Sequence, residues 1–454
     1  MKFYSTLSRT VEEFTPLDSV VRMYVCGLTP YSEAHVGHAM RSVIFDVLRR
    51  YLEFRGYQVK FVENFTDIDD KMIDRAAEQG ETVLELAERN IRLYLDQMEA
   101  LNILPAHLYP RATEEIPKII EMVQTMIENE VAYDVDGDVY FHVRSDPGYG
   151  RLSGRDVESL RVGSRIELDE RKRDGLDFAL WKAQKPGEPA WDSPWGKGRP
   201  GWHIECSAMA AKYLGDNIDI HGGGQDLIFP HHENEIAQSE SFTEVEPFAR
   251  FWLHNGMLRL GVEKMSKSLG NIVTLGEALE RHSSDALRLF FLNSHYRSPL
   301  IYREDIVEAQ ERAAERLRRA ATVESEGGDN DSLDPSPYHE KFIEAMDDDL
   351  NTPRALAVLF DMSRDINRAR EEDRDISHAQ SMLRELTGVL GLTLEEPETD
   401  GSADVGALID LLISTRMALR AAKQYDLADS IRDQLADLGY ILEDNPGGTT
   451  WKRA

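Results

Sequence analysis

The chain has 454 residues, of which 41% are hydrophobic and 30% charged, so we expect a folded protein of two to four domains. Lys and Arg number 52 against 82 Asp and Glu, which gives a net charge of −30 that is spread along the chain. Two cysteines exclude a disulfide framework, no apolar run reaches the roughly 18 residues of a membrane-spanning helix, and the first ten residues lack the apolar core of a signal peptide, so we expect a cytoplasmic protein.

The acidity argues against a nucleic-acid partner at ordinary salt, because phosphates are bound by Lys and Arg. At molar salt the Debye length falls to about 3 Å, and net charge then steers little. Excess carboxylates also keep a protein soluble in concentrated salt. We therefore interpret the charge as that of a halophile's protein, against the alternative of a moderately acidic mesophilic one.

The first segment predicts a parallel α/β unit. Residues 21–25 are rich in β-formers, residues 36–51 carry apolar side chains at helical spacing, and residues 58–62 predict a second strand. Strand, helix and strand in this order are typical of a parallel sheet covered by helices. Residues 67–100 predict further helix.

An insertion interrupts this pattern. Alternating sequence over 131–141 surrounds an Asp-Gly pair and predicts a hairpin. The sequence stays rich in Gly, Pro and Trp up to about residue 200, and a short strand at 218–220 then returns to α/β character.

The remainder is predicted to be helical from residue 304 onward. Acidic stretches with Gly, Ser and Pro predict flexible connections over 322–337 and 395–406. The last fifty residues predict two helices followed by a strand at 440–442.

A first chemical motif, His35-Val36-Gly37-His38, stands at the start of the first long helix. Histidines at i and i+3 share a helix face, and a helix N-terminus attracts anions. Gly37 allows a ligand to approach the backbone closely. The motif predicts a phosphate cradle, with two surface histidines as the alternative.

A second motif runs from Lys264 to Ser268 and contains Ser266 and Lys267. Two lysines three residues apart suit a loop that stabilises the charge of a leaving phosphate. The alternative is an ordinary solvated loop.

Cys26, Cys206, His231 and Glu235 are all residue types that bind zinc, and the last two share a helix face at i and i+4. The cysteines lie 180 residues apart, so spacing alone favours two ordinary buried cysteines.

Taken together, the two motifs resemble the signatures of class I aminoacyl-tRNA synthetases. The first differs from His-Ile-Gly-His only at Val36, and the second matches at all five positions. Further segments resemble the cysteinyl-tRNA synthetases and cover nearly the whole chain: 64–71, 201–209, 221–235, 346–353 and 448–451.

The resemblance implies an α/β fold in which a Rossmann-like catalytic domain is split by an insertion and followed by an all-α tRNA-binding domain and a small C-terminal α/β domain. The expected segments are 1–115 (catalytic, first half), 116–200 (connective insertion), 201–303 (catalytic, second half), 304–395 (helical tRNA-binding bundle) and 405–454 (anticodon-binding domain).

It further implies a reaction. ATP and cysteine would give cysteinyl-adenylate and pyrophosphate, and the cysteinyl group would pass to the 3'-terminal adenosine of tRNA-Cys. One zinc ion per chain, held by Cys26, Cys206, His231 and Glu235, would select the thiolate of the substrate over a hydroxyl, either by accepting the sulfur as a fifth ligand or by loosening Glu235. We expect Mg²⁺ with ATP, a monomer, and no membrane partner.

Residue roles are also implied by the resemblance. Catalysis would rest on His35, His38, Lys264 and Lys267. ATP would be bound by His35, Gly37, His38, Gly223, Gly224, Asp226, Lys264, Ser266 and Lys267. The cysteine pocket would contain Cys26, Thr66 and Trp202, although Trp202 has core packing as an alternative.

One departure from the family opens a second function. Thr29-Pro30-Tyr31 after Cys26 is similar to the ATP-dependent cysteine:amino-sugar ligases of mycothiol synthesis, which share the zinc site but lack a full C-terminal RNA-binding region. The helical region after residue 304 favours the synthetase.

Overall fold

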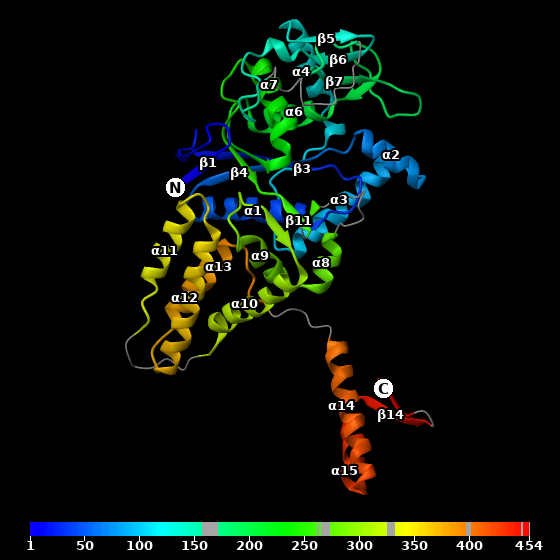
Figure 1. Cartoon of the computed structure of the whole chain (residues 1–454), viewed down its shortest axis with the longest axis vertical. Coiled ribbons are helices and arrows are strands. Elements are labelled where there is room, and N and C mark those ends of the chain that lie inside the picture. The colour runs from blue at the N-terminus through cyan, green and yellow to red at the C-terminus, as the bar shows by residue number, and fades with distance from the viewer. Residues whose placement is uncertain are drawn as a thin grey trace. The chain divides into compact units, whose positions relative to one another are not determined.

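The computed structural model describes residues 1–156, 171–260, 263–264, 273–324, 332–395, 401–445 and 448–453. The chain forms two compact units, Met1–Leu394 and Glu395–Ala454 (Figure 1). Within the described ranges, no helix is both long and apolar enough to cross a membrane.

A parallel sheet of four strands lies at the centre of the larger unit, in the order β10-β9-β3-β4. The strands are β3 (Val20–Leu28), β4 (Gln58–Phe65), β9 (Ile218–Gly224) and β10 (Ala249–Asn255). Segments from both sides of the insertion therefore share one sheet. The strands expected at 21–25, 58–62 and 218–220 are confirmed, and each is longer than the sequence indicated.

Side chains of β3 alternate between two cores, as a strand requires. Met23 and Val25 pack with α1 (Val36–Phe54), whereas Tyr24 and Cys26 pack with α6 (Trp202–Leu214). Helices on both faces explain why this strand is so apolar. The register of β3 thereby directs Cys26 toward the helix that carries Cys206.

The insertion forms an antiparallel sheet in the order β5-β6-β7-β8. Its elements are α4 (Ile116–Glu128), β5 (Ala132–Val135), β6 (Asp138–Phe141), β7 (Phe178–Ala183) and β8 (Gly198–Pro200). Asp136 and Gly137 both have positive φ, 53° and 89°, which the tight hairpin turn needs. The predicted hairpin is confirmed.

Figure 1 shows the insertion on one side of the central sheet and a bundle of helices on the other. The bundle consists of α10 (Glu304–Thr322), α11 (Ser336–Asp347), α12 (Thr352–Glu371) and α13 (Ser377–Val389). The other helices of this unit are α2 (Asp70–Gln79), α3 (Val83–Ala100), α7 (Glu233–Thr243), α8 (Leu275–Arg281) and α9 (Ser284–Leu292). Short strands, which the sequence did not indicate, are β1 (Lys2–Ser5), β2 (Thr10–Glu13), β11 (Leu258–Leu260), β12 (Glu263–Lys264) and β13 (Leu300–Tyr302).

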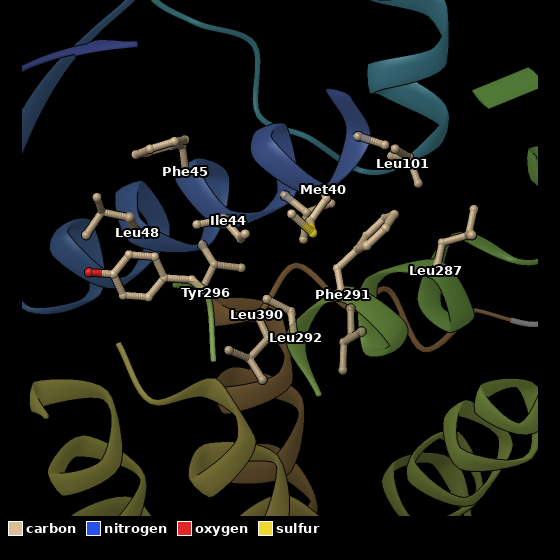
Figure 2. Packing of buried hydrophobic residues seen from close by; sticks show 14 of the residues in the cluster. Met40, Ile44, Phe45, Leu48, Leu101, Leu287, Phe291, Leu292, Tyr296 and Leu390 are labelled. Atoms are coloured by element: carbon tan, nitrogen blue, oxygen red, sulfur yellow. The ribbon is translucent and has the colours of Figure 1, made fainter. Parts of the chain in front are cut away.

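Helix α1 is packed against the elements that lead into the bundle. Figure 2 shows Met40 and Ile44 of α1 facing Phe291 and Leu292 of α9, with Leu390 beside them. These side chains belong to one continuous hydrophobic core. The central sheet and the helical bundle are therefore packed as one body.

A buried ion pair crosses the same junction. Arg288 of α9 lies 2.5 Å from Asp46 of α1, and neither side chain is exposed. The guanidinium also donates to the carbonyls of Leu101 and Leu390 at 2.9 and 3.0 Å. Arg288 thus holds α1, α9 and the end of α13 together.

The smaller unit contains α14 (Gly401–Ala421), α15 (Tyr425–Asp437) and the antiparallel pair β14 (Tyr440–Asn445) and β15 (Gly448–Arg453). The two helices and the strand at 440–442 are confirmed. The linker expected over 395–406 is wrong from residue 401 onward, where α14 begins. Gly, Ser and Asp resemble linker composition, but Ser and Asp are also the residues that begin helices.

The buried pair gives a stability prediction. Arg288→Met should lower the free energy of unfolding by about 3–5 kcal/mol, because Asp46 and two buried carbonyls lose their donor. Urea unfolding followed by circular dichroism measures this change. Arg75→Met, in the exposed Arg75–Glu78 pair, is the matched control and should change stability by less than about 1 kcal/mol. Equal effects of the two substitutions would contradict the role of the buried pair.

Candidate functional site

Four side chains from distant parts of the sequence meet beside the central sheet. Cys26 lies near the C-terminal end of β3, and Cys206 lies on α6. His231 precedes α7, and Glu235 lies in the first turn of α7. Their ligand atoms all lie within 4.8 Å of one another and all four residues are buried. Two thiols, an imidazole and a carboxylate form a donor set that fits a thiophilic divalent metal. The cluster could hold a metal ion.

Glu235 is the centre of the cluster. One carboxylate oxygen, Oε1, lies 3.2 Å from Cys26 Sγ and 3.0 Å from His231 Nε2. The other, Oε2, lies 2.9 Å from His221 Nε2. His221, on β9, therefore holds the oxygen that faces away from the Cys26 thiol. A second donor set, Cys26, His221, His232 and Glu235, overlaps the first and shares this carboxylate.

The charges of the cluster are unequal. Burial raises the pKa of the Cys26 thiol, whereas the hydrogen bond from Cys26 lowers the pKa of Cys206 to about 6. Burial works against charge on His231, but Glu235 and Cys206 raise its pKa to about 10. Burial likewise opposes charge on Glu235, yet His221 and His231 hold its pKa well below the ordinary value. At neutral pH the metal-free cluster therefore carries protons on Cys26 and His231, two sites that a metal would occupy.

The backbone at Cys26 is held from two sides. Arg41 of α1 donates to the carbonyl of Cys26 and, at 2.8 Å, to that of Gly27. Asn64 Oδ1 accepts the Gly27 N–H at 2.9 Å and lies 3.7 Å from Cys206 Sγ. A Cβ on Gly27 would lie 1.7 Å from the Asn64 carbonyl, so only glycine fits here. Both supporting residues lie outside the sequence-predicted set.

More histidines surround the cluster than the sequence analysis singled out. His203 Nδ1 lies 3.0 Å from His231 Nδ1. His232 Nδ1 lies 2.7 Å from His254 Nε2, and Trp252 stacks on His221 with ring centroids 4.3 Å apart. His221 could have been found from its position, because it directly precedes the glycines 222–224. The contacts of His203 and His254 depend on the tertiary structure.

The first signature motif begins α1 and is ordered by its own side chains. His35 is the N-cap, and its Nδ1 accepts the Gly37 N–H at 3.1 Å. His38 Nδ1 accepts the His35 N–H at 3.2 Å, and the two rings stack with centroids 3.7 Å apart. The imidazoles therefore lie over the helix N-terminus, where an anion is favoured.

The chain returns to this point after the second signature. Val36 N–H donates to the Val273 carbonyl at 3.2 Å, and Leu275 N–H donates to the Ala34 carbonyl at 2.8 Å. Lys264 ends the short strand β12, which pairs with β11. Ser266 and Lys267 lie outside the described residues. The described residues Val273 and Leu275 are thus hydrogen-bonded to the start of α1.

The remaining predicted residues lie at the carboxyl ends of the strands. Thr66 follows β4, is buried, and accepts a 3.4 Å hydrogen bond from Asn64 Nδ2. Trp202 begins α6, is 39% exposed and stacks on His231 with centroids 4.3 Å apart, so the core-packing alternative is wrong.

Gly223 and Gly224 end β9, and Asp226 follows in an exposed turn. A Cβ on Gly224 would lie 2.5 Å from the Asp226 carboxylate, and one on Gly223 would lie 2.7 Å from the His232 ring. A larger side chain at either position would therefore collide with the His232 ring or the Asp226 carboxylate. In open parallel sheets, ligands bind at the carboxyl ends of the strands, where these glycines lie.

The protonation of the cluster predicts proton-linked metal binding. Titration of the metal-free protein with Zn²⁺ near pH 7.5 should release about two protons, from Cys26 and His231, so affinity rises with pH. Calorimetry in buffers of different ionisation enthalpy measures this number. Release of no protons would contradict the assigned protonation, and Cys206→Ser is expected to weaken binding by at least tenfold.

Comparison with known proteins agrees with this geometry. Residues 13–312 match the model of the catalytic domain of class I (C) tRNA synthetases, and residues 341–395 match the DALR domain. The chain is 57% identical over 454 residues to a cysteine–tRNA ligase of Dehalococcoides mccartyi, covering 100% of this chain and 99% of the relative. It is 52% identical over 462 residues to a cysteine–tRNA ligase of Alkalilimnicola ehrlichii, covering 100% of both chains.

The fold has a solved counterpart. Methionyl-tRNA synthetase of Mycobacterium tuberculosis in complex with methionyl-adenylate superposes with a TM-score of 0.58 at 18% identity, over 87% of this chain and 94% of that one. The class I synthetase fold expected from the sequence is therefore confirmed, and the relatives do not support an amino-sugar ligase. By catalytic-domain match and full-length identity, the chain belongs to the cysteine–tRNA ligase family of class I tRNA synthetases.

Proposed function

We propose that the protein joins cysteine to tRNA-Cys in two steps. Cysteine and ATP react to cysteinyl-adenylate and pyrophosphate, and the cysteinyl group is then transferred to the 3'-terminal adenosine of the tRNA. The observation that carries this proposal is the buried cluster of Cys26, Cys206, His231 and Glu235, whose Cys26 carbonyl is held by Arg41 of the histidine-capped helix α1. Proximity of the cysteine carboxylate and the α-phosphate supplies much of the rate.

The resident metal of the proposed site is Zn²⁺, held by Cys26, Cys206, His231 and Glu235. When bound, zinc supplies a thiophilic Lewis acid that favours a substrate thiolate over a hydroxyl. His221 orients Glu235 through Oε2, and Trp202 covers His231 from the solvent side. Thr66, at the buried end of β4, completes the pocket for the cysteine substrate.

The proposed ATP site lies along the N-terminus of α1 and the end of β9. His35 and His38 contact the triphosphate, Gly37 allows its close approach, and Lys264 with Lys267 stabilises the departing pyrophosphate. Further ATP contacts are assigned to Ser266, Gly223, Gly224 and Asp226, the last to the ribose. Mg²⁺ accompanies ATP.

The rest of the chain is assigned to tRNA. In this proposal, residues 1–115 and 201–303 form the catalytic domain, 116–200 the insertion, 304–395 a tRNA-binding bundle and 405–454 an anticodon-binding domain. We further propose that the protein is a monomer in the cytoplasm. A salt-loving host would account for its acidic composition.

The decisive experiment is charging of total tRNA with labelled cysteine and ATP in molar KCl. We expect the tRNA to be charged with cysteine. A zinc chelator should abolish this charging, and labelled serine in place of cysteine should not be attached to the tRNA. If tRNA remains uncharged while cysteine still drives ATP–pyrophosphate exchange, the acceptor is a different molecule. Absence of both activities would refute the proposed function.

A substitution tests the second signature. Lys267→Ala should lower the rate of adenylate formation by on the order of 10²–10³, because the transition state loses a positive charge aimed at the leaving pyrophosphate. Pre-steady-state adenylate formation measures the rate, and cysteine binding should change little.

The matched control is Lys185→Ala, on an exposed loop of the insertion, which should leave the rate unchanged. Near-normal adenylate formation by the Lys267 variant would remove that lysine from the proposed mechanism.

A further inference from the structure

A groove of arginines lies on the helical bundle of this acidic chain. It encloses about 580 Å³ between α10 and α12. Arg316 and Arg319 line it from α10, and Arg364 and Arg370 line it from α12. All four are exposed, and none of the lining residues is acidic. Against a net charge of −30, the groove is a local concentration of positive charge.

The arginines differ in how much of their charge is already neutralised. Arg319 pairs with Glu315, and Arg364 pairs with Asp361. Arg316 and Arg370 have no carboxylate within ion-pairing distance in the part of the chain that the structure describes. The guanidinium of Arg316 lies over the ring of Phe360, 5.1 Å from its centroid, and Phe360 also lines the groove. Two unneutralised cations therefore face solvent from opposite helices.

The C-terminal end of α10, which would repel an anion, is covered. Its last carbonyls carry partial negative charge. Gln380 of α13 donates to the carbonyls of Ala320 and Val323, each at 2.9 Å, and Arg384 donates to that of Ala321 at 2.5 Å. These three carbonyls are thus satisfied by side chains of α13, which do not line the groove, and the groove presents the guanidinium groups of α10 and α12.

We propose that this groove binds the ribose-phosphate backbone of the tRNA, with Arg316 and Arg370 each contacting a phosphate. The inference rests on the proposed function and names the surface by which an acidic protein holds its polyanionic substrate. Guanidinium groups bind phosphate through two parallel hydrogen bonds, and such contacts need no long-range attraction. Asn367, between Arg364 and Arg370 on α12, adds an uncharged hydrogen-bonding group to the same wall.

Salt dependence of binding provides the test. The affinity of the full chain for unmodified tRNA-Cys transcript is measured by filter binding over a range of KCl in which circular dichroism shows it folded. Each phosphate contact adds about one unit to the slope of log affinity against log salt. The variant Arg316→Ala/Arg370→Ala should lose about two units of slope and bind roughly tenfold or more weakly at the lowest salt.

Two further variants separate charge from folding. Arg316→Lys/Arg370→Lys keeps both charges and should retain the slope with a smaller loss of affinity. Arg354→Ala removes an exposed arginine of α12 that is already paired with Glu344 and Asp348, and should change neither quantity. An unchanged slope in the double alanine variant, or an equal loss of slope and affinity in the Arg354 variant, would contradict the proposal that the groove binds tRNA.

The outcome is independent of the proposed reaction. Binding is measured without ATP or cysteine, so the affinity for tRNA alone tests whether the groove binds the tRNA backbone. ATP–pyrophosphate exchange by the unsubstituted protein, which needs no tRNA, tests the reaction separately. A chain that exchanges pyrophosphate and charges tRNA, while its double alanine variant binds tRNA unchanged, would refute the groove and leave the proposed function intact.

Discussion

The carboxylate of Glu235 is completely buried, and the surrounding structure is organised by the need to stabilise that charge. An isolated buried carboxylate is costly, so each oxygen requires partners. They come from β3, β9 and the turn before α7, which must converge for the charge to be tolerated. Because these partners include a thiol and a histidine that both carry protons, the same convergence prepares a set of donors for a cation. The demands of folding and of metal binding are therefore met by the same contacts.

Helix α1 connects this cluster to the rest of the larger unit. Its N-terminus carries His35 and His38, its second turn sends Arg41 to the carbonyls at Cys26, and its middle buries Asp46 against Arg288. At 1.5 Å per residue, its 19 residues extend for about 28 Å. One helix thus contacts α9, the backbone at Cys26 and the candidate nucleotide site.

The sequence predicted three of the four central strands because β-forming residues dominate 21–25, 58–62 and 218–220, but it did not indicate β10. It predicted the hairpin because an Asp-Gly pair between alternating residues is typical of a tight turn. It could not separate metal ligands from ordinary buried cysteines, since Cys26 and Cys206 meet only through the alternation along β3 and the packing of α6. Arg41 and Asn64 escaped notice because their function lies in main-chain contacts that no motif records. The helix from residue 401 was missed because helix-starting and linker residues overlap in type. The roles of the predicted catalytic, ATP-binding and metal-binding residues remain predictions, and Ser266 and Lys267 lie outside the described residues.

Both cysteines of the chain belong to the candidate metal centre. An enzyme that supplies cysteine to translation also supplies the two cysteines of its own next copy. A copy with serine at either position would exchange a soft sulfur donor for a hard oxygen and hold the metal poorly. Errors of charging would therefore also reach newly made copies of the enzyme and inactivate those that carry serine at either position. The placement of its only thiols makes inaccurate synthesis self-limiting rather than self-amplifying.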